Sequence, residues 1–466
     1  MAGVPLSRLL DLTAEAVQAV RGGRSLNDVL PRVPPDARPG VQALSFHVLR
    51  WLGSASELRA RLAPKTPPPV VEGLLLTALA LLWPVTGPAG EARQPYPDHT
   101  LVDQAVAAVR TRAPAAAGFV NAVLRRFIRE RDVLAAAVRH APVGAYNHPL
   151  WWVERVRQDW PGHWASLLEA ANLHPPMTLR VNARRSTGAA YVQRLQAEGR
   201  PAQLLADPAL GGQAVVLAQP CAVHLLPGFA QGDVSVQDAA AQRAARLLLG
   251  LEGSGVARLP ANARVLDACA APGGKTAHLL ELAELDLLAL DSDAQRLTRV
   301  HDTLQRLQLP SSRAGMGEAA VNGTTLQAAD ARQTRAWWDG QPFDAILLDA
   351  PCTASGIVRR HPDVRWLRRS EDIAALARTQ AALLDALWPL LKPGGRLLYA
   401  SCSLFKAEGQ HQVDAFLQRT GAASARLDPA SPGHLLPLAD NPTGAASPGA
   451  ALQDGFFYAL LHKAPA

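Results

Sequence analysis

The stretches Phe343–Gly356, FDAILLDAPCTASG, and Gly394–Ser403, GGRLLYASCS, decide how this chain folds. Each contains a short apolar run that is typical of a buried strand and that leads into a cysteine, Cys352 in the first and Cys402 in the second. Because ligands of parallel sheets bind beyond the carboxyl ends of the strands, both thiols are predicted to lie at the ligand crevice. Two thiols in such a place favour covalent nucleophilic chemistry over packing or metal binding.

The C-terminal half, from about residue 237 to 466, alternates strand-like and helix-like patterns around these two stretches. The predicted strands are 263–269, 286–291, 325–330, 344–350, 395–402 and 456–463. Helical spacing covers 293–307 and 373–391, and the small, polar stretch Leu309–Thr324 is predicted to be a mobile loop. Strands that alternate with helices predict an α/β fold, with a mostly parallel sheet and helices on both of its faces.

A glycine-containing loop follows the first of these strands. It lies in Val265–Thr276, VLDACAAPGGKT, and leads into a predicted helix. Gly273 and Gly274 let the backbone approach a ligand closely, and the start of the helix offers free N–H groups. The loop matches neither the dinucleotide fingerprint nor the P-loop pattern, so it does not indicate a phosphate chain.

Carboxylates lie at or near the ends of three of the predicted strands, at Asp267, Asp291 and Asp330. Asp291 stands after the second strand, where a carboxylate accepts hydrogen bonds from a ribose diol. This layout favours an adenosine cofactor without a phosphate chain, and S-adenosylmethionine is the candidate that fits best.

Residues 1 to about 145 are predicted to be entirely helical, with proline-rich joints at Leu30–Gly40 and Ala63–Val70. The predicted helix from Phe119 to Asp132 is amphipathic. Four arginines lie on or near its polar side: Arg125, Arg126, Arg129 and Arg131. They form either a solvated helix face or a ridge that binds phosphates.

Residues from about 146 to 236 are predicted to form a small mixed α/β unit. Strands are expected at 178–183 and 213–218, with a helix at 188–199 between them. Two helices rich in tryptophan precede the first strand. Their tryptophans are expected to serve mainly as core: Trp151, Trp152, Trp160 and Trp164.

Composition points to a globular protein with a basic surface. The net charge is +7, and only five of the 47 basic residues are lysines. The excess favours a polyanionic partner such as nucleic acid, although a GC-rich genome would produce the same arginine bias. Four cysteines without a CxxC pair argue against a disulfide scaffold or a zinc site. No signal-peptide core or membrane-spanning apolar run is found, so a cytoplasmic protein with reduced thiols is expected.

Together, the motifs of the C-terminal half resemble those of the RNA cytosine-C5 methyltransferases. These are LDACAAPGGKT at 266–276, LLDAPCTASG at 347–356 with RRHPDVRW at 359–366, and LLYASCS at 397–403. Nearly the whole chain is similar to the Sun/Fmu, RsmB-type, branch of this family, including GFVNAVLRRF at 118–127 and DGFFYALL at 454–461.

The resemblance implies three domains. They are a NusB-like, all-helical RNA-binding domain over 1–145, a small α/β RNA-binding or linker unit over 146–236, and a Rossmann-like class I methyltransferase domain over 237–466. It also implies S-adenosylmethionine-dependent methylation of cytosine carbon 5 in small-subunit (16S) ribosomal RNA, at a position of the 967 type.

The resemblance also assigns roles to the residues of the motifs. Cys402 is expected to add to carbon 6 of cytosine, which makes carbon 5 nucleophilic, and Cys352 to serve release of the product. Asp349 is expected to contact the ring edge that carries nitrogen 3. The alternative is that both cysteines are small buried packing residues. Cys269 is expected to line the cofactor loop without reacting, and Cys221 to be structural.

Binding residues are assigned on the same basis. The cofactor is expected to be held by Cys269, Ala270, Ala271, Pro272, Gly273, Gly274, Lys275, Asp291, Asp330 and Asp349. Lys275 either orients substrate or cofactor or lies on the surface at a helix start. RNA contact is assigned to Arg125, Arg126, Arg129, Arg359, Arg360 and His361, and no metal ion is expected. His361 could instead cap local structure.

Two other functions fit the same residues less well. One is cytosine-C5 methylation of transfer RNA, and the other is a non-catalytic RNA-binding or ribosome-assembly role. The intact cysteine motifs, Asp291 and the glycine loop argue against the second. For either RNA the target base must be unpaired or flipped out, because carbon 6 is inaccessible inside a helix. The chain is expected to act as a monomer without membrane contact.

Overall fold

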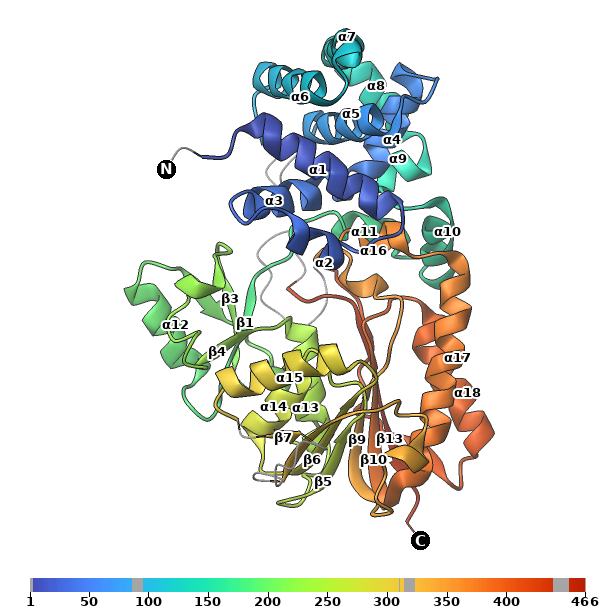
Figure 1. Cartoon of the computed structure of the whole chain (residues 1–466). Helices are drawn as coiled ribbons and strands as arrows, with labels where there is room; N and C mark the ends of the chain where they lie inside the picture. The colour runs from blue at the N-terminus through green and yellow to red at the C-terminus, as the bar shows by residue number, and fades with distance from the viewer. Residues whose placement is uncertain (1–2, 86–94, 310, 314–322, 439–451, 466) are drawn as a thin grey trace. The chain divides into compact units, whose positions relative to one another are not determined.

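The computed structural model of the chain describes residues 3–85, 95–309, 311–313, 323–438 and 452–465 (Figure 1). The chain forms two compact units. The helical unit comprises Met1–His174 together with Val358–Ser370, and the sheet unit comprises Pro175–Ile357 together with Glu371–Ala466. The chain therefore leaves the sheet unit after Ile357, contributes thirteen residues to the helical unit and returns at Glu371.

The helical unit is built around α5 (Pro69–Leu82). This helix is apolar except for Glu72 and Thr77, and its residues are buried from Val71 to Leu82, as expected for a helix that is covered on all sides. It packs against α1, α3, α4, α6 and α7. The helices of the unit are α1 (Leu6–Arg21), α2 (Leu26–Val29), α3 (Arg38–Arg50), α4 (Leu52–Leu62), α5, α6 (Asp98–Arg112), α7 (Ala117–Arg129), α8 (Arg131–Arg139), α9 (Pro142–Tyr146), α10 (Leu150–Asp159), α11 (Trp164–Ala170) and α16 (Val364–Leu367).

One detail of the helical unit differs from the prediction. The helix expected from Phe119 to Asp132 is two helices, because Glu130 leaves the helical conformation between α7 and α8. The contacts of the tryptophan-rich helices α10 and α11 place them in this compact unit. Of their tryptophans, Trp152 is fully buried and Trp151, Trp160 and Trp164 are half-buried.

Buried Arg365 explains where α10 and α11 lie. Its guanidinium donates to the carbonyl of Asn147 at 3.1 Å, to Oδ1 of Asn172 at 2.5 Å and to the carbonyl of Ala171 at 2.7 Å. These acceptors flank the two helices, and Arg365 is on the returning segment Val358–Ser370. An arginine with no exposed surface is therefore compensated by hydrogen bonds that fix the segment inside the helical unit.

The sheet unit begins with a small antiparallel sheet in the order β2-β3-β1-β4. Its strands are β1 (Thr178–Val181), β2 (Ala202–Leu204), β3 (Ala214–Leu217) and β4 (Val234–Val236), and α12 (Gly188–Ala197) packs on it. The sequence predicted β1, α12 and β3. It missed β2 and β4, because three residues are too few to show a period-two pattern.

The large sheet has the order β11-β13-β10-β9-β5-β6-β8-β7, with β12 paired to β13. Strands from β10 to β7 are parallel, and β13 runs antiparallel between β10 and β11. The bounds are β5 (Arg264–Asp267), β6 (Asp286–Asp291), β7 (Ser312–Arg313), β8 (Thr324–Ala328), β9 (Phe343–Asp349), β10 (Leu391–Ser401), β11 (Ala425–Leu427), β12 (Gly433–Leu435) and β13 (Phe456–Lys463). The predicted α/β fold with a mostly parallel sheet is confirmed.

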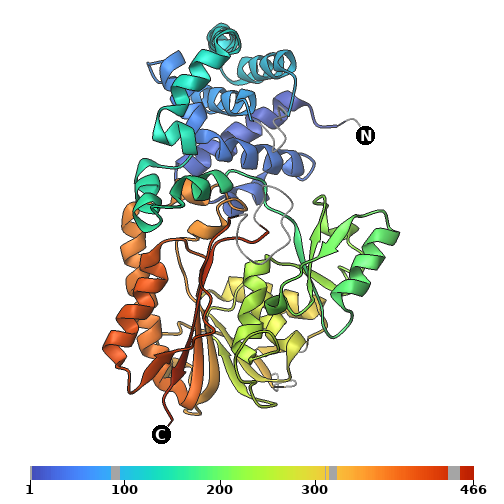
Figure 2. The same cartoon turned by 180° about the vertical axis from the view of Figure 1, so that it is seen from behind.

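Helices cover both faces of this sheet (Figures 1 and 2). They are α13 (Ala239–Leu249), α14 (Gly274–Leu282) and α15 (Ala294–Arg306) on one face, and α17 (Ser370–Leu387) and α18 (Gln410–Thr420) on the other. Strand β9 shows the reason. Ala345 and Leu347 pack in the core that α13, α14 and α15 share, whereas Ile346 and Leu348 pack in the core that α17 and α18 share. A strand buried on both faces needs apolar residues at every position.

The stretch Leu309–Thr324 is not wholly a loop. Ser312 and Arg313 form β7, which pairs in parallel with Thr325 and Leu326 at the edge of the sheet. Residues 310 and 314–322 lie outside the described residues, so the rest of that prediction is not tested. Within the described part of the chain, no helix is long and apolar enough to cross a membrane.

Candidate active site

A cavity of about 280 Å³ lies at the carboxyl ends of the central parallel strands. Asp267, Asp291 and Asp349 are the last residues of β5, β6 and β9, and strand register places these ends side by side. The cavity brings together seven residues that the sequence predicted to belong to the site. They are Cys269, Ala271, Asp291, Asp330, Asp349, Cys352 and Cys402.

The two motif cysteines meet in this cavity. Cys352 follows β9 and Cys402 follows β10, and their Sγ atoms are 3.4 Å apart. Hydrogen bonding to Cys402 and burial together raise the pKa of Cys352 well above its usual value, so this thiol stays protonated. A protonated thiol is thus held next to the sulfur of Cys402.

Lys275 and Asp349 form an ion pair beside the cysteines. The Lys275 Nζ lies 2.6 Å from Oδ2 of Asp349 and 5.4 Å from the centre of the Phe456 ring. Burial alone would lower the pKa of Lys275, but the charge and hydrogen bond of Asp349, together with the charges of Cys402 and Asp267, outweigh it, and the net shift is upward. Only 13% of the lysine side chain is exposed, so it is not a surface residue at the start of α14.

The glycine loop is held against the end of β6. The Ala271 N–H donates to Oδ2 of Asp291 at 3.1 Å, and the Ala270 N–H donates to the carbonyl of Leu290 at 2.8 Å. Gly273 has a φ of +98°, and a Cβ there would lie 3.0 Å from the Cα of Val300. Glycine is therefore required at this position for both conformation and space.

The carboxylates of the site differ in burial and in their hydrogen-bond partners. Asp291 is 3% exposed and also accepts from the Asp293 N–H at 3.0 Å. Asp330 lies two residues beyond β8 and takes a two-pronged hydrogen bond from Arg332, which lowers its pKa. Asp267 accepts from the Thr276 hydroxyl at 2.7 Å, and burial raises its pKa to about 7.

These residues fit the predicted adenosine cofactor. The Asp291 carboxylate lines the cavity and has lone pairs beyond those used by two backbone N–H groups, so it can accept from a diol. Cys269 lines the same cavity, and burial raises the pKa of its thiol, so the thiol stays protonated and unreactive. Among the described residues, no group of three or more His, Cys, Asp or Glu side chains could hold a metal ion.

The sequence did not mark several residues that line the cavity, nor one buried residue that hydrogen-bonds to both cysteine loops. Ser292, Arg296, Thr379 and Leu383 line the cavity, but no motif marks them. Glu408 is fully buried and accepts hydrogen bonds from the residues that follow each motif cysteine. The only signal for it in the sequence was an acidic residue shortly after Cys402.

The predicted RNA-contacting residues lie in the helical unit. Arg125, Arg126 and Arg129 are exposed on α7, and Arg125 and Arg129 line a groove of about 570 Å³ between α6 and α7. Arg359 is only 3% exposed, so it has little surface to offer an RNA backbone, contrary to expectation. Arg360 and His361 are half-buried.

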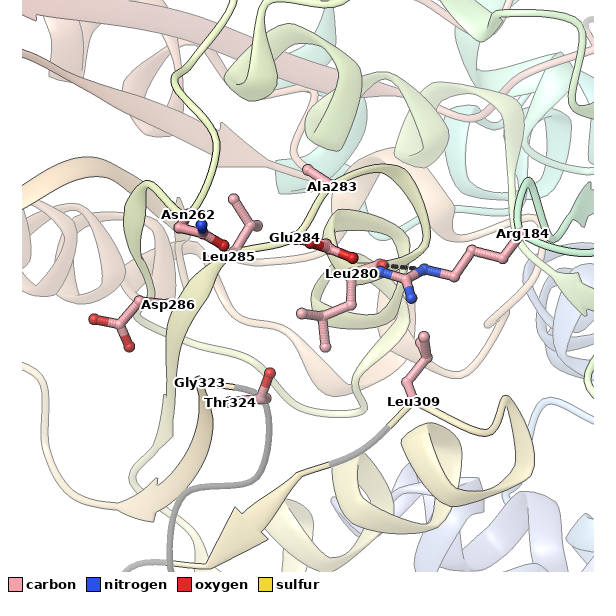
Figure 3. A pocket seen from close by; sticks show the side chains of 10 residues that line it. All are labelled: Arg184, Asn262, Leu280, Ala283, Glu284, Leu285, Asp286, Leu309, Gly323 and Thr324. Carbon is pink, nitrogen blue, oxygen red and sulfur yellow. Dashed lines mark hydrogen bonds between the residues drawn. The ribbon is translucent and has the colours of Figure 1, made fainter.

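A second cavity of the sheet unit, of about 480 Å³, is separate from this site (Figure 3). Asn262, Asp286 and Thr324, which stand at the amino ends of β5, β6 and β8, line it together with Arg184. Ligands of parallel sheets bind at the opposite, carboxyl ends. We assign this cavity no function.

Comparison with known proteins identifies the family. The model of the 16S rRNA methyltransferase RsmB/F family matches residues 256–462, and that of the RsmF/B-like ferredoxin-like domain matches residues 148–224. The chain is 40% identical to ribosomal RNA small subunit methyltransferase B of Vibrio cholerae over 459 residues, covering 96% of this chain and 95% of that protein. It is 41% identical to the protein of the same name from Pseudomonas syringae pv. tomato over 465 residues, covering 97% and 96%.

Solved structures share the fold. The crystal structure of PH0851 superposes with a TM-score of 0.70 at 21% identity and covers 99% of both chains. A methyltransferase homolog protein from Pyrococcus horikoshii gives a TM-score of 0.53 at 25% identity and covers 69% of this chain and 97% of its own. The protein is an RNA methyltransferase that uses S-adenosylmethionine. The chain belongs to the RsmB/F family of 16S rRNA methyltransferases.

Proposed function

We propose that the protein methylates carbon 5 of a cytosine in small-subunit ribosomal RNA through a covalent bond between Cys402 and carbon 6 of the base. The observation that carries this proposal is the 3.4 Å approach of the Cys352 and Cys402 sulfurs at the carboxyl ends of β9 and β10. The names of the relatives from Vibrio cholerae and Pseudomonas syringae support the choice of RNA.

Each of the residues Cys402, Asp349 and Cys352 serves a different step of the proposed reaction. The Cys402 thiolate adds to carbon 6, and the electron pair displaced onto the ring makes carbon 5 nucleophilic. S-adenosylmethionine supplies the methyl group when bound. Asp349, fixed by Lys275 at 2.6 Å, contacts the ring edge that carries nitrogen 3. A solvent base then takes the carbon-5 proton, the electron pair of that C–H bond restores the double bond between carbons 5 and 6, and the sulfur–carbon bond breaks to return the Cys402 thiolate. Cys352 serves this release, and its sulfur is 3.4 Å from that of Cys402.

The cofactor is held by the loop after β5 and by the carboxylate that ends β6. We assign the ribose diol to Asp291, and close backbone contact to the segment from Cys269 to Lys275. Asp330 and Asp349 complete the acidic rim of the cavity.

The product of the reaction tests this function directly. Small-subunit RNA from a strain that lacks the gene is incubated with the protein and S-adenosylmethionine, and bisulfite sequencing then reads every cytosine. We expect one protected cytosine in the small-subunit RNA and none in transfer RNA. A modified base other than 5-methylcytosine, or protection only in transfer RNA, would refute the proposed substrate.

Asp291→Ala should weaken binding of S-adenosylmethionine by about 1–3 kcal/mol, because it removes hydrogen bonds to a charged group. The same change removes the acceptor of the Ala271 N–H, so the glycine loop is held less firmly as well. Isothermal titration calorimetry measures the affinity. Asp293→Ala is the matched control, since that carboxylate caps α15 and does not line the cavity. Equal affinities of the Asp291 variant and the parent protein would exclude the ribose role.

Replacing Arg125, Arg126 and Arg129 together by alanine should weaken RNA binding and reduce its dependence on salt. Each arginine that no longer neutralises a phosphate lowers the slope of log K against log salt by about 0.7–0.9, because fewer counterions are released. Filter binding over a salt series measures both quantities, and affinity for S-adenosylmethionine should not change.

The control for this triple variant removes the same charge elsewhere in the helical unit. Arg8, Arg24 and Arg61 are exposed on or beside α1 and α4 and do not line the groove between α6 and α7. Equal salt slopes for the two triple variants would mean that the α7 arginines form only a solvated face.

A further inference from the structure

Glu408 is a buried carboxylate directly beneath the two cysteine loops. It has no exposed surface, and no cation among the described residues forms an ion pair with it. Burying an unpaired carboxylate is costly, and an apolar side chain of similar size would normally be cheaper. This cost indicates a specific role for Glu408, and its hydrogen bonds show which parts of the site it connects.

The carboxylate joins the two loops. It accepts from the Thr353 N–H at 2.9 Å and from the Thr353 hydroxyl, and from the Ser403 hydroxyl at 2.6 Å. Thr353 is the residue after Cys352, and Ser403 is the residue after Cys402. A third donor is the Gln380 amide at 3.2 Å, which also donates to the carbonyl of Pro351 at 2.9 Å.

The backbone of Glu408 holds the strand that carries Cys402. Its carbonyl accepts from the Tyr399 hydroxyl at 2.8 Å and from the Ser401 hydroxyl at 3.1 Å. One residue thus binds both neighbours of Cys402 and the neighbour of Cys352. The donors are fully buried, so the arrangement cannot exchange its partners with solvent.

Glu408 also acts on the thiols through its charge. Burial raises the pKa of Glu408, while hydrogen bonds from Ser403, Thr353 and Gln380 oppose that shift. Its carboxylate is one of the groups that raise the pKa of Cys352, after the hydrogen bond to Cys402, burial and the charge of Cys402. The negative charge of Glu408 therefore contributes to keeping Cys352 in the thiol form.

We propose that Glu408 is a positioning residue that holds the Cys352 and Cys402 loops at their separation of 3.4 Å, and that product release depends on it. The proposal rests on the covalent mechanism proposed above. It assigns no contact between Glu408 and the substrate.

The test compares Glu408→Gln with the parent protein. The amide keeps the shape but removes the charge, and it presents an NH₂ group where two hydroxyls donate, so the Thr353 and Ser403 hydroxyls can keep their hydrogen bonds only by turning to accept. We expect methylation to slow by roughly tenfold or more, with denaturation-resistant protein–RNA adduct accumulating, because release suffers more than attack. Affinity for S-adenosylmethionine should stay within about twofold. Glu408→Asp, which keeps the charge, should recover part of the rate.

A second measurement needs neither RNA nor cofactor. Alkylation of Cys352 is followed against pH by mass spectrometry of its peptide, and Glu408→Gln should shift that profile to lower pH, because a charge that raises the thiol pKa is removed. Glu198→Gln is the control, since Glu198 is exposed at the end of α12 and should change neither profile nor rate.

The outcomes separate this inference from the proposed function. If the parent protein forms 5-methylcytosine and Glu408→Gln matches it in rate and alkylation profile, the role of Glu408 is refuted and the function stands. If Glu408→Gln unfolds, Thr353→Val and Ser403→Ala each remove one donor and should reproduce the slowed release singly. Normal release in both would also refute the inference. If the parent protein itself forms no 5-methylcytosine, the proposed function is refuted instead.

Discussion

Cys402→Ala is expected to abolish methylation and to form no covalent adduct with RNA, whereas Cys352→Ala is expected to accumulate one. Addition and elimination are separate steps, and removing a side chain blocks the step that it serves. Without the Cys402 sulfur no bond to carbon 6 forms. Without Cys352 the bond still forms and the methyl group is still transferred, but the enzyme stays attached to its product.

A denaturing gel of protein, RNA and S-adenosylmethionine reads this result directly. Adduct should be a band of reduced mobility for Cys352→Ala, absent for Cys402→Ala and absent from the double variant. Cys221→Ala is a matched control, because that cysteine is free and does not line the cavity. The reverse pattern would exchange the roles of the two cysteines, and no adduct in any variant would count against release by Cys352.

Arg180→Met should lower the free energy of unfolding by about 3–5 kcal/mol, because it leaves a buried carboxylate without its partner. Arg180 on β1 donates to both carboxylate oxygens of Glu281 on α14, at 2.9 Å and 2.7 Å, and both side chains are 1% exposed. The guanidinium also donates to the carbonyl of Gly274 at 2.7 Å, where α14 and the glycine loop meet. We therefore expect weaker binding of S-adenosylmethionine as well.

Urea denaturation and calorimetry measure these two effects. The double variant Arg180→Met with Glu281→Leu should recover much of the stability, since neither buried charge remains. Arg194→Met is the matched control: its ion pair with Asp233 spans 2.9 Å, but the arginine side chain is 48% exposed. A pair that water still reaches should contribute less than about 1 kcal/mol. Equal losses of stability for Arg180→Met and Arg194→Met would contradict this account.

Much of the sheet unit could be predicted from the sequence because its signals are local. Apolar runs such as those of β9 and β10 report burial on both faces of a sheet, and they place Asp349, Cys352 and Cys402 at or just beyond strand ends. The mixture of arginine and aromatic residues from Arg359 to Trp366 was misleading for Arg359. Arg365 in the same stretch is also buried, and it donates hydrogen bonds to Ala171 and Asn172, more than 190 positions away along the chain.

The sequence by itself determined the alternation of strands and helices, the glycine loop at a strand end, and the choice of thiols and carboxylates that can react. Only the tertiary structure decided that Cys352 and Cys402 touch, that Lys275 meets Asp349, and that Glu408 lies beneath both cysteine loops. The reason is physical. Periodicity and turn chemistry act over a few residues. The contacts of Cys402 with Cys352, of Glu408 with Thr353 and of Lys275 with Asp349 instead join positions 50 to 74 residues apart, which the strand order of the sheet brings together.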